Sequence, residues 1–442
     1  MNIEVENLPN CLASLRVEIA PEQVSKEWDE VVEAFRKAAK IPGYRPGKAP
    51  VKVVETKFRK DIREELTKRL IGDTTRQAIK EKGLNVLTVS QVDDVELTPE
   101  KAMRFTATLV TSPEFELPEY KGIQVRVPSA DISEAAVDDA MQKLRERAAT
   151  FSDVPERALE IGDYAIIDYE ISFDGKPVSE VFSNVHQMWK GGTDFWIKVD
   201  EETFFPGLGS RIVGMKIKDS RSFDLEIPAD YGVHALANKT LHFELTLKAI
   251  KTSILPELDD KFAGQISSGI DLQTLKGLIR KNLQEENAEQ IENLKREQII
   301  NHLVSLVECE LPDAFVKRET KRIMSEIVQE NQHRGVSEES LREHQKDIIK
   351  NASKAAKGRL KANFILLRIA DKQGLKVTEE ERHKRIQVLA ATHRMSFEKM
   401  VDELHRNGTI AQVEEDLLLA KVLDFLSSNA TVQTSPEKVV AG

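Results

Sequence analysis

The most localised chemical signal in the sequence is a run of positive charge between residues 36 and 60. These 25 residues hold nine basic side chains and a single acid, Glu55, and so carry a net charge of +8. The basic residues are Arg36, Lys37, Lys40, Arg45, Lys48, Lys52, Lys57, Arg59 and Lys60. Dense lysine and arginine attract phosphate backbones, although a solvated domain face has the same composition. Since the whole chain carries -10, the remainder carries -18.

A segment rich in proline and glycine, residues 41–50, lies inside this basic stretch. Its three prolines and two glycines exclude a helix, and it presents Tyr44 beside Arg45 and Lys48. Surface loops that carry such side chains commonly bind partners. We therefore expect residues 41–50 to form a docking loop for a charged partner.

Motifs for metal and nucleotide chemistry are incomplete. The sequence contains no His-Glu-x-x-His or Cys-x-x-Cys pattern, and its nine histidines show no ligand-like grouping. Gly47-Lys48 would end a phosphate loop, but Pro42 replaces its first glycine and Ala49 its serine or threonine. We expect no cofactor, no metal and no ATP hydrolysis.

Cysteine content and hydropathy indicate the cellular compartment in which the protein is expected. Cys11 and Cys309 are the only cysteines, which is typical of a reducing cytosol. Acids at the start of the chain, Met1–Asn7, do not fit a signal peptide. The most apolar run, Ile410–Leu426, is interrupted by charges and cannot span a bilayer. We expect a cytoplasmic protein that does not bind membranes.

The elements that must position the basic loop are strands and helices. Apolar residues alternate with polar ones over 15–19 and 105–109, which predicts half-buried strands. Apolar residues at three- to four-residue spacing predict helices over 24–39 and 62–79. Residues 1–112 are therefore expected to form an α+β domain.

The two prolines of 112–120 predict an extended linker rather than a packed element, followed by a helix that Ser133 caps.

The rest of the chain divides into a β region and a helical region. Alternation over 165–173, 223–227 and 241–247 predicts a small, mostly antiparallel β domain, which holds most of the aromatic residues. From Asp271 onward, long amphipathic helices are expected, with stops at Pro312, Gly335 and Gly374. Asp271 is expected to cap the first of them, and Thr378 with Glu381 predicts a capping box for a later one. Residues 284–290 are nearly free of apolar side chains, so we expect that part of the first helix to project as an arm.

The loop resembles the Gly-Phe-Arg-x-Gly-Lys-x-Pro signature of trigger factors, a family of ribosome-associated bacterial chaperones. Gly43, Tyr44, Arg45, Gly47 and Lys48 lie on this pattern, and Pro50 completes it. The resemblance implies four parts in order: a ribosome-binding domain at 1–112, a linker and helix at 113–150, an FKBP-like domain at 151–250 and a helical chaperone domain at 251–442. Tyr44 replaces the usual phenylalanine, and Pro46 stands where a basic residue is common, which predicts weaker ribosome affinity.

The β region resembles FKBP-type peptidyl-prolyl isomerases through Ile167-Asp168-Tyr169, Phe204 to Leu208, Ile227 to Gly232 and Leu241 to Leu245. Such a site needs no nucleophile, because an apolar, water-poor pocket that favours a twisted imide lowers the barrier of about 18 to 20 kcal/mol. By this resemblance the pocket walls, which are the catalytic positions, are Tyr169, Phe205, Leu208, Tyr231 and Phe243. Aromatic residues in strands are also ordinary core residues.

Two positions depart from the isomerase pattern. Val178-Ser179 falls where phenylalanine and an acid are expected, and Leu208 occupies a position that is normally aromatic. These departures predict weak isomerase activity with binding of proline-containing segments retained, because stabilising the twisted state is the more demanding property.

The resemblance also implies partners and an overall function. The partners would be the large ribosomal subunit beside the exit tunnel, both protein and rRNA, nascent unfolded polypeptides, and a second copy of the chain when free. Segments 113–150 and 251–442 would form a cradle for unfolded chains. The function would be ATP-independent chaperoning with proline isomerisation, in protein folding and export. A stand-alone isomerase and a nucleic-acid-binding protein that uses the basic patch remain alternatives.

Overall fold

The computed structural model describes residues 1–39, 41–42, 44–45, 47–97, 102–154, 156–182, 185–200, 205–228, 231, 236–333, 341–342 and 344–435. The strands are β1 (Asn2–Leu8), β2 (Leu12–Ile19), β3 (Val86–Leu97), β4 (Met103–Thr111), β5 (Gln124–Pro128), β6 (Thr150–Asp153), β7 (Tyr164–Phe173), β8 (Lys176–Pro177), β9 (Gly192–Lys198), β10 (Ser220–Glu226), β11 (Thr240–Ile254) and β12 (Thr431–Ser435). The helices are α1 (Pro21–Ala38), α2 (Val51–Lys57), α3 (Arg59–Lys82), α4 (Glu134–Arg147), α5 (Val178–Val181), η1 (Gln187–Lys190), α6 (Leu208–Ile212), α7 (Asp260–Ile266), α8 (Leu272–Leu306), α9 (Asp313–His333), α11 (Gln345–Gln373), α12 (Glu379–Thr392), α13 (Phe397–Asn407) and α14 (Ile410–Ser428).

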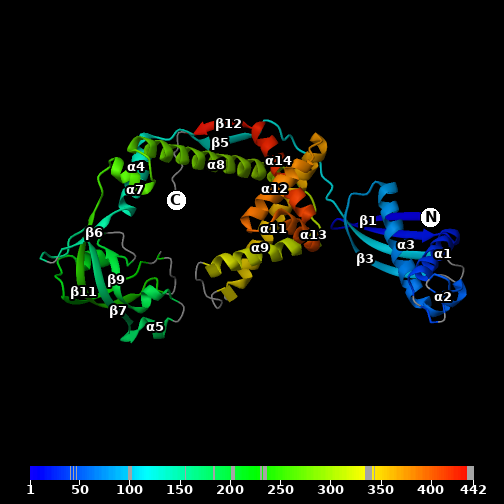
Figure 1. Cartoon of the computed structure of the whole chain (residues 1–442), viewed down its shortest axis with the longest axis horizontal. Helices are drawn as coiled ribbons and strands as arrows, with labels where there is room; N and C mark the ends of the chain where they lie inside the picture. Colours follow the sequence, from blue (N-terminus) through cyan, green and yellow to red (C-terminus); the bar gives the residue numbers. More distant parts are fainter. Residues whose placement is uncertain are drawn as a thin grey trace. The chain divides into compact units, whose positions relative to one another are not determined.

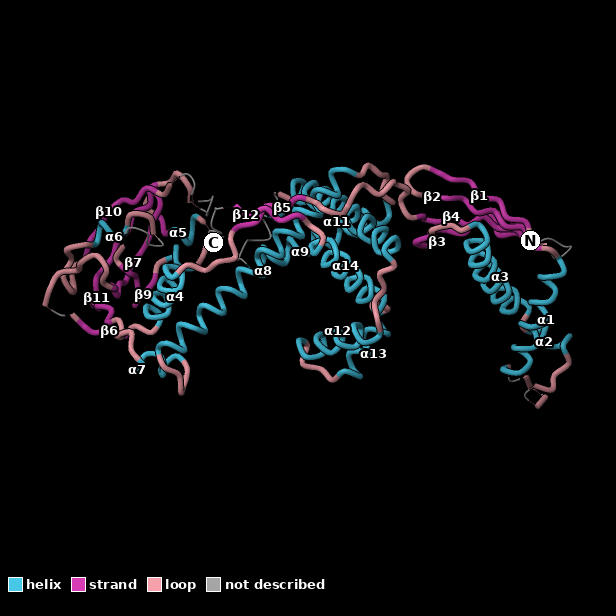
Figure 2. Tube along the Cα trace, turned by 90° about the horizontal axis from the view of Figure 1, so that it is seen from above, coloured by secondary structure: helices cyan, strands magenta, loops and turns pink. Residues whose placement is uncertain are grey.

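The N-terminal strands form a four-stranded antiparallel sheet in the order β1-β2-β4-β3, drawn in magenta in Figure 2. The alternation in the sequence places Leu15, Val17 and Phe105 on one face, where they are almost fully buried. Helices α1 and α3 contribute Val31, Ile62 and further apolar residues to the same core. The expected α+β arrangement of this part of the chain is confirmed.

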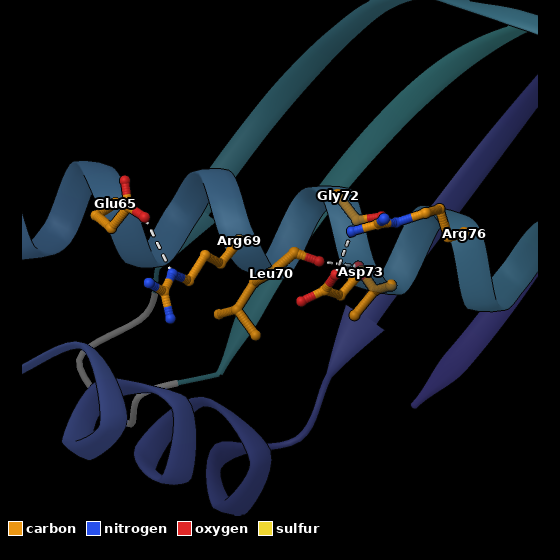
Figure 3. Close-up of polar contacts among 7 residues, drawn as sticks. Glu65, Arg69, Leu70, Gly72, Asp73 and Arg76 are labelled. Carbon is orange, nitrogen blue, oxygen red and sulfur yellow. Dashed lines mark hydrogen bonds and ion pairs between the residues drawn. The ribbon is translucent and has the colours of Figure 1, made fainter. Parts of the chain in front are cut away.

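Two arginines of α3 pair with acids of the same helix (Figure 3). Arg69 donates to the carboxylate of Glu65 at 3.0 Å, and Arg76 donates to that of Asp73 at 2.5 Å. Both pairs join residues three or four apart, the spacing at which side chains of one helix face meet. These two ion pairs offset the positive charges of Arg69 and Arg76.

A second antiparallel sheet has the order β10-β11-β7-β8, with β6 paired to β11 and β9 paired to β7. These strands lie together in Figure 1, in the green part of the chain. One sheet face, the helix α6 and η1 enclose a single apolar core that contains most of the aromatic residues of the region. The sequence predicted this sheet correctly, including the alternation along β7.

The connector after β4 corrects one expectation. It is extended, as its prolines require, but it is packed rather than free. Tyr120 and Ile123 are 7% and 6% exposed and lie in a core with residues of α8, α11 and α14, while Phe115 and Leu117 pack against that core. The Tyr120 hydroxyl also accepts a hydrogen bond of 2.7 Å from Gln373. The prolines keep the backbone extended, but the apolar residues between and just after them determine the burial.

The C-terminal region is helical, as expected, and its helix ends carry the predicted caps. Asp271 accepts a hydrogen bond of 2.8 Å from the Thr274 amide just ahead of the first long helix, α8. Thr378 and Glu381 form the predicted capping box at the start of α12. Residues 284–290 of α8 are largely exposed, as the lack of apolar side chains indicates. The predicted stop at Arg334-Gly335 lies outside the described residues.

The described residues were also searched for membrane spans and metal sites. None of their helices is long and apolar enough to cross a membrane. Within the same residues no group of three or more histidine, cysteine, aspartate or glutamate side chains is arranged to hold a metal ion.

Candidate functional site

The basic loop is anchored at both ends and exposed between them. Ile41 and Ala49 are 7% and 4% exposed and belong to the core of the N-terminal sheet. Between them, Tyr44 is 43% exposed, and Arg45 and Lys48 are also exposed. Two buried apolar anchors with polar and aromatic side chains at the tip hold the loop on the domain while leaving its tip available to a partner.

Two backbone turns shape this loop. The Tyr44 amide donates to the Ile41 carbonyl at 3.1 Å, and the Lys48 amide donates to the Arg45 carbonyl at 2.9 Å. Gly47 lies in the second turn with φ of +78°, a left-handed conformation that favours glycine. Gly43, the remaining loop position of the candidate site, lies outside the described residues.

Some side chains of the basic stretch are paired within the N-terminal domain. Arg36 forms a salt bridge with Glu33 at 2.8 Å, and the single acid, Glu55, accepts a hydrogen bond of 2.8 Å from Trp28. Within the part of the chain that the structure describes, Arg45 and Lys48 form no salt bridge. Their charges are therefore available to an acidic partner.

The structure brings together the five positions that the isomerase resemblance assigns to a pocket. Tyr169 comes from β7, Leu208 from α6 and Phe243 from β11, and all three lie in the core of the second sheet. The ring centroids of Tyr169 and Phe205 are 5.5 Å apart, and those of Phe205 and Phe243 are 5.4 Å apart, both edge to face. Tyr231 packs against the same core and is only partly buried.

The helix α6 depends on close packing of the backbone. A Cβ atom on Gly209 would lie 2.2 Å from the carbonyl oxygen of Asp200, so only glycine fits there. This contact sets the start of α6, from which Leu208 reaches the core with 0% of its surface exposed. Gly207-Leu208-Gly209 is thus a structural turn.

Sequence reasoning did not assign Trp189 to the site. This residue lies on η1, is 0% exposed and packs edge to face on Phe205 at a centroid distance of 4.9 Å. It also contacts the rings of Tyr231 at 5.6 Å and Phe243 at 6.4 Å. The available signal was a tryptophan two residues before a Gly-Gly pair, in a segment with no strand alternation.

Val178 and Ser179, which form one of the two departures from the isomerase pattern, differ in exposure. Val178 is 0% exposed and belongs to the core, whereas Ser179 is exposed at the start of α5. Neither supplies an aromatic ring or a carboxylate at the positions where the resemblance expects them.

The chemistry available around these rings is that of an apolar interior. Burial raises the pKa of Tyr169 to about 12 and also raises the pKa of Tyr231, so both hydroxyl groups stay protonated at neutral pH. The Tyr169 hydroxyl donates a hydrogen bond of 2.6 Å to the backbone carbonyl of Met188. Such surroundings suit noncovalent stabilisation of an apolar, twisted group and contain no activated nucleophile.

Comparison with known families agrees with this chemistry. Residues 156–248 match the FKBP-type peptidyl-prolyl cis-trans isomerases, so the second sheet and its aromatic core form a domain of that class. Residues 1–144 match the bacterial trigger factor protein, and residues 271–428 match the C-terminal part of the same protein. The chain thus combines an isomerase domain with two parts characteristic of a chaperone.

Relatives of known identity match along the whole length. The trigger factor of Akkermansia muciniphila is 34% identical over 98% of this chain and 99% of its own. That of Opitutus terrae is 30% identical over 99% of this chain and 100% of its own. A solved structure of a trigger factor chaperone covers 97% of this chain and 99% of its own, with 19% identity and a TM-score of 0.48. The chain belongs to the trigger factor family of chaperones.

Proposed function

We propose that this chaperone docks on the large ribosomal subunit beside the exit tunnel through the loop 41–50 and shields nascent chains without ATP. In this proposal residues 1–112 bind the ribosome, 113–150 join the helical body, 151–250 isomerise X-Pro bonds, and 251–442 hold unfolded chains. Contact with rRNA as well as ribosomal protein, a cytoplasmic location, self-association of the free chain and a role in protein folding and export belong to the same proposal.

The observation that carries the docking proposal is the loop itself. Its buried ends, Ile41 and Ala49, fix an exposed tip on which Tyr44, Arg45 and Lys48 are presented together. Phosphate groups and acidic side chains of a ribosomal surface would pair with the two cations, and the ring of Tyr44 adds an amphipathic contact. The charge of the whole chain, -10, disfavours attachment to nucleic acid elsewhere on its surface.

Ribosome co-sedimentation tests the docking proposal. We expect the double variant Arg45→Ala with Lys48→Ala to lose most of its binding to empty ribosomes. The matched control is Lys384→Ala with Arg385→Ala, which removes the same charge from two exposed positions on α12. Wild-type binding by the loop variant, or equal loss in both variants, would contradict the proposal.

For the isomerase domain, we assign the catalytic contacts to Tyr169, Phe205, Leu208, Tyr231 and Phe243. The residues converge from separate elements, and together they offer an apolar, water-poor surrounding for a twisted imide. A protease-free peptide assay of Phe243→Ala tests the assignment. An unchanged kcat/KM in a folded variant would place the site elsewhere.

The chaperone part of the proposal draws support from apolar side chains that the helices leave exposed. Leu278, Leu306, Ile349 and Val388 on helices, and Met395 between α12 and α13, have between 40% and 54% of their surface accessible. Scattered aliphatic and methionine side chains suit weak contacts with many sequences. Suppression of aggregation of a denatured reporter protein tests this part, and no suppression at equimolar chaperone would contradict it.

A further inference from the structure

The walls of the candidate prolyl site have almost no free surface. Phe205, Leu208 and Phe243 are each 0% exposed, and Tyr169 is 3% exposed. A prolyl ring can contact these four side chains only if another group first moves away from them. In this structure another group of the protein therefore covers the walls that a prolyl ring would contact.

Trp189 is the residue that fills this space. Its indole packs edge to face on Phe205, Tyr231 and Phe243, which are three of the five assigned walls. It is also 0% exposed although it comes from η1, a helix of only four residues. A flat apolar ring on a short element outside the strands is well suited to stand in for a prolyl ring.

Side-chain hydrogen bonds connect η1 to neighbouring residues. The Tyr169 hydroxyl donates to the Met188 carbonyl at 2.6 Å, and the His186 side chain caps the helix by accepting from the Met188 amide at 3.3 Å. Directly after η1, Gly191 has φ of +95°, a conformation that favours glycine. Two assigned walls of the site thus contact η1 through their polar groups: Tyr169 through Met188, and Tyr231 through a side-chain hydrogen bond with Trp189.

We propose that Trp189 competes with the substrate for the isomerase site and must leave the core before an X-Pro segment can bind. The proposal rests on the assignment of the five walls made above. A substrate must displace the indole, so its apparent affinity is reduced by the fraction of molecules in which the site is open. Trp189 is therefore a residue that determines which substrates enter, and it opposes binding rather than assisting it.

If Trp189 instead served as a wall of the site, its removal would have the opposite effect on substrate binding. Leu208 stands at a position that the resemblance gives as normally aromatic, so Trp189 could supply the missing ring from another element. A ring that serves as a wall would strengthen substrate binding, and its loss would reduce activity. Removal of Trp189 therefore separates the two roles.

The first measurement is protease-free isomerisation of a tetrapeptide anilide with the sequence Ala-Phe-Pro-Phe. For Trp189→Leu we expect KM to fall about tenfold with kcat nearly unchanged, because the variant removes a competitor that acts on binding alone. The matched control is Trp196→Leu, which removes a tryptophan of the same domain that is 45% exposed and packs on Phe151. We expect the control to keep the wild-type KM.

The second measurement follows Trp189 itself and does not require its replacement. The variant Trp28→Phe with Trp196→Phe keeps Trp189 as the only tryptophan, since the chain has three. Saturation with the same peptide should shift the emission to longer wavelength and increase acrylamide quenching. A peptide with alanine in place of proline should cause neither change.

The outcomes are distinct for the two proposals. A lower kcat/KM in Trp189→Leu, or emission that stays unshifted with saturating peptide, overturns the competition and makes Trp189 a wall. If Phe243→Ala keeps the wild-type kcat/KM, the assignment of the site is wrong as well. If Phe243→Ala is inactive and Trp189→Leu is also impaired, the site stands and only the competition fails.

Discussion

The hydroxyl group of Tyr169 donates a hydrogen bond of 2.6 Å to the backbone carbonyl of Met188 and so joins β7 to η1. Tyr169 is 3% exposed, and burial raises its pKa to about 12, so the hydroxyl remains a donor at any pH at which the protein is handled. This single bond connects an assigned wall of the isomerase site to the segment that carries Trp189.

Replacement of Tyr169 by phenylalanine should therefore destabilise the domain and loosen η1. We expect a loss of about 1 to 3 kcal/mol in the free energy of unfolding, because the Met188 carbonyl keeps its surroundings but loses its donor. Urea unfolding of the full chain measures this loss. Acrylamide quenching of Trp189, in the background without the other tryptophans, should increase. Tyr164→Phe, a control in the same strand, should change stability by less than about 0.5 kcal/mol.

Isomerisation and chaperone activity should separate in a variant of Tyr231. This residue is only partly buried, so Tyr231→Ala removes a ring of the site at lower cost to the core than Phe243→Ala. We expect kcat/KM for the proline peptide to fall about tenfold or more while suppression of aggregation is unchanged, since the exposed apolar side chains of the helices are untouched. A parallel loss of both activities would show that the isomerase domain also provides the main chaperone surface.

The sequence predicted the elements well where one physical signal dominated. Alternation located β2, β4 and β7, and side-chain chemistry located the caps at Ser133 and Thr378. The five positions assigned by the isomerase resemblance pack in or against one core, and strand register accounts for the burial of two of them, Tyr169 and Phe243.

The sequence did not reveal what long-range packing decides. Tyr120 is buried because helices from the far end of the chain cover it, and Trp189 is buried because η1 folds back onto the sheet. Neither burial produces a regular spacing of apolar residues in the local sequence, since both depend on contacts between segments distant in sequence. Exposure of the loop at Tyr44 was predictable for the opposite reason, because prolines and glycines act locally.

Ribosome binding should depend on the backbone of the loop as well as on its charges. Gly47 has φ of +78° and nothing within 4 Å of the position where a Cβ would lie, so Gly47→Ala meets backbone strain but no clash. We expect a cost of about 1 to 2 kcal/mol to hold the turn, and a corresponding loss of ribosome affinity. Gly72→Ala on α3 has equal space without a positive φ, and it should stabilise the domain by about 0.5 to 1 kcal/mol with ribosome binding retained. Equal affinities of both variants would show that the turn at Gly47 does not present the docking residues.

A buried ion pair in the isomerase domain predicts an asymmetric response to mutation. The guanidinium of Arg157 donates to both carboxylate oxygens of Asp163, at 2.5 and 2.8 Å, and the Glu160 amide donates to the same group at 3.0 Å. The side chain of Asp163 is 5% exposed, whereas that of Arg157 is 35% exposed. Loss of the arginine therefore leaves a buried charge without its counterion, but loss of the aspartate leaves a cation that can reach water.

Arg157→Met should consequently destabilise the domain by about 3 to 5 kcal/mol, and Asp163→Asn by less. The pH dependence of the free energy of unfolding should also reverse between the wild type and Arg157→Met. In the wild type burial raises the pKa of Asp163, but the hydrogen bonds from Arg157 and the Glu160 amide outweigh it, so the net pKa lies below its ordinary value. A lowered pKa gives stability that is present above about pH 4 and is lost as the pH falls through the folded value.

In Arg157→Met burial acts against the charged form with less opposition, so the pKa of Asp163 should rise above its ordinary value. Stability should then increase as the pH is lowered from 7 toward 5, because protonation removes the unpaired charge. Urea unfolding of wild type, Arg157→Met and Asp163→Asn at pH 7, 5 and 4 measures these slopes. Asp163→Asn, which cannot titrate at this position, should show neither the acid-induced loss of the wild type nor the gain of Arg157→Met. Parallel slopes in all three proteins would mean that another group controls the acid response of this domain.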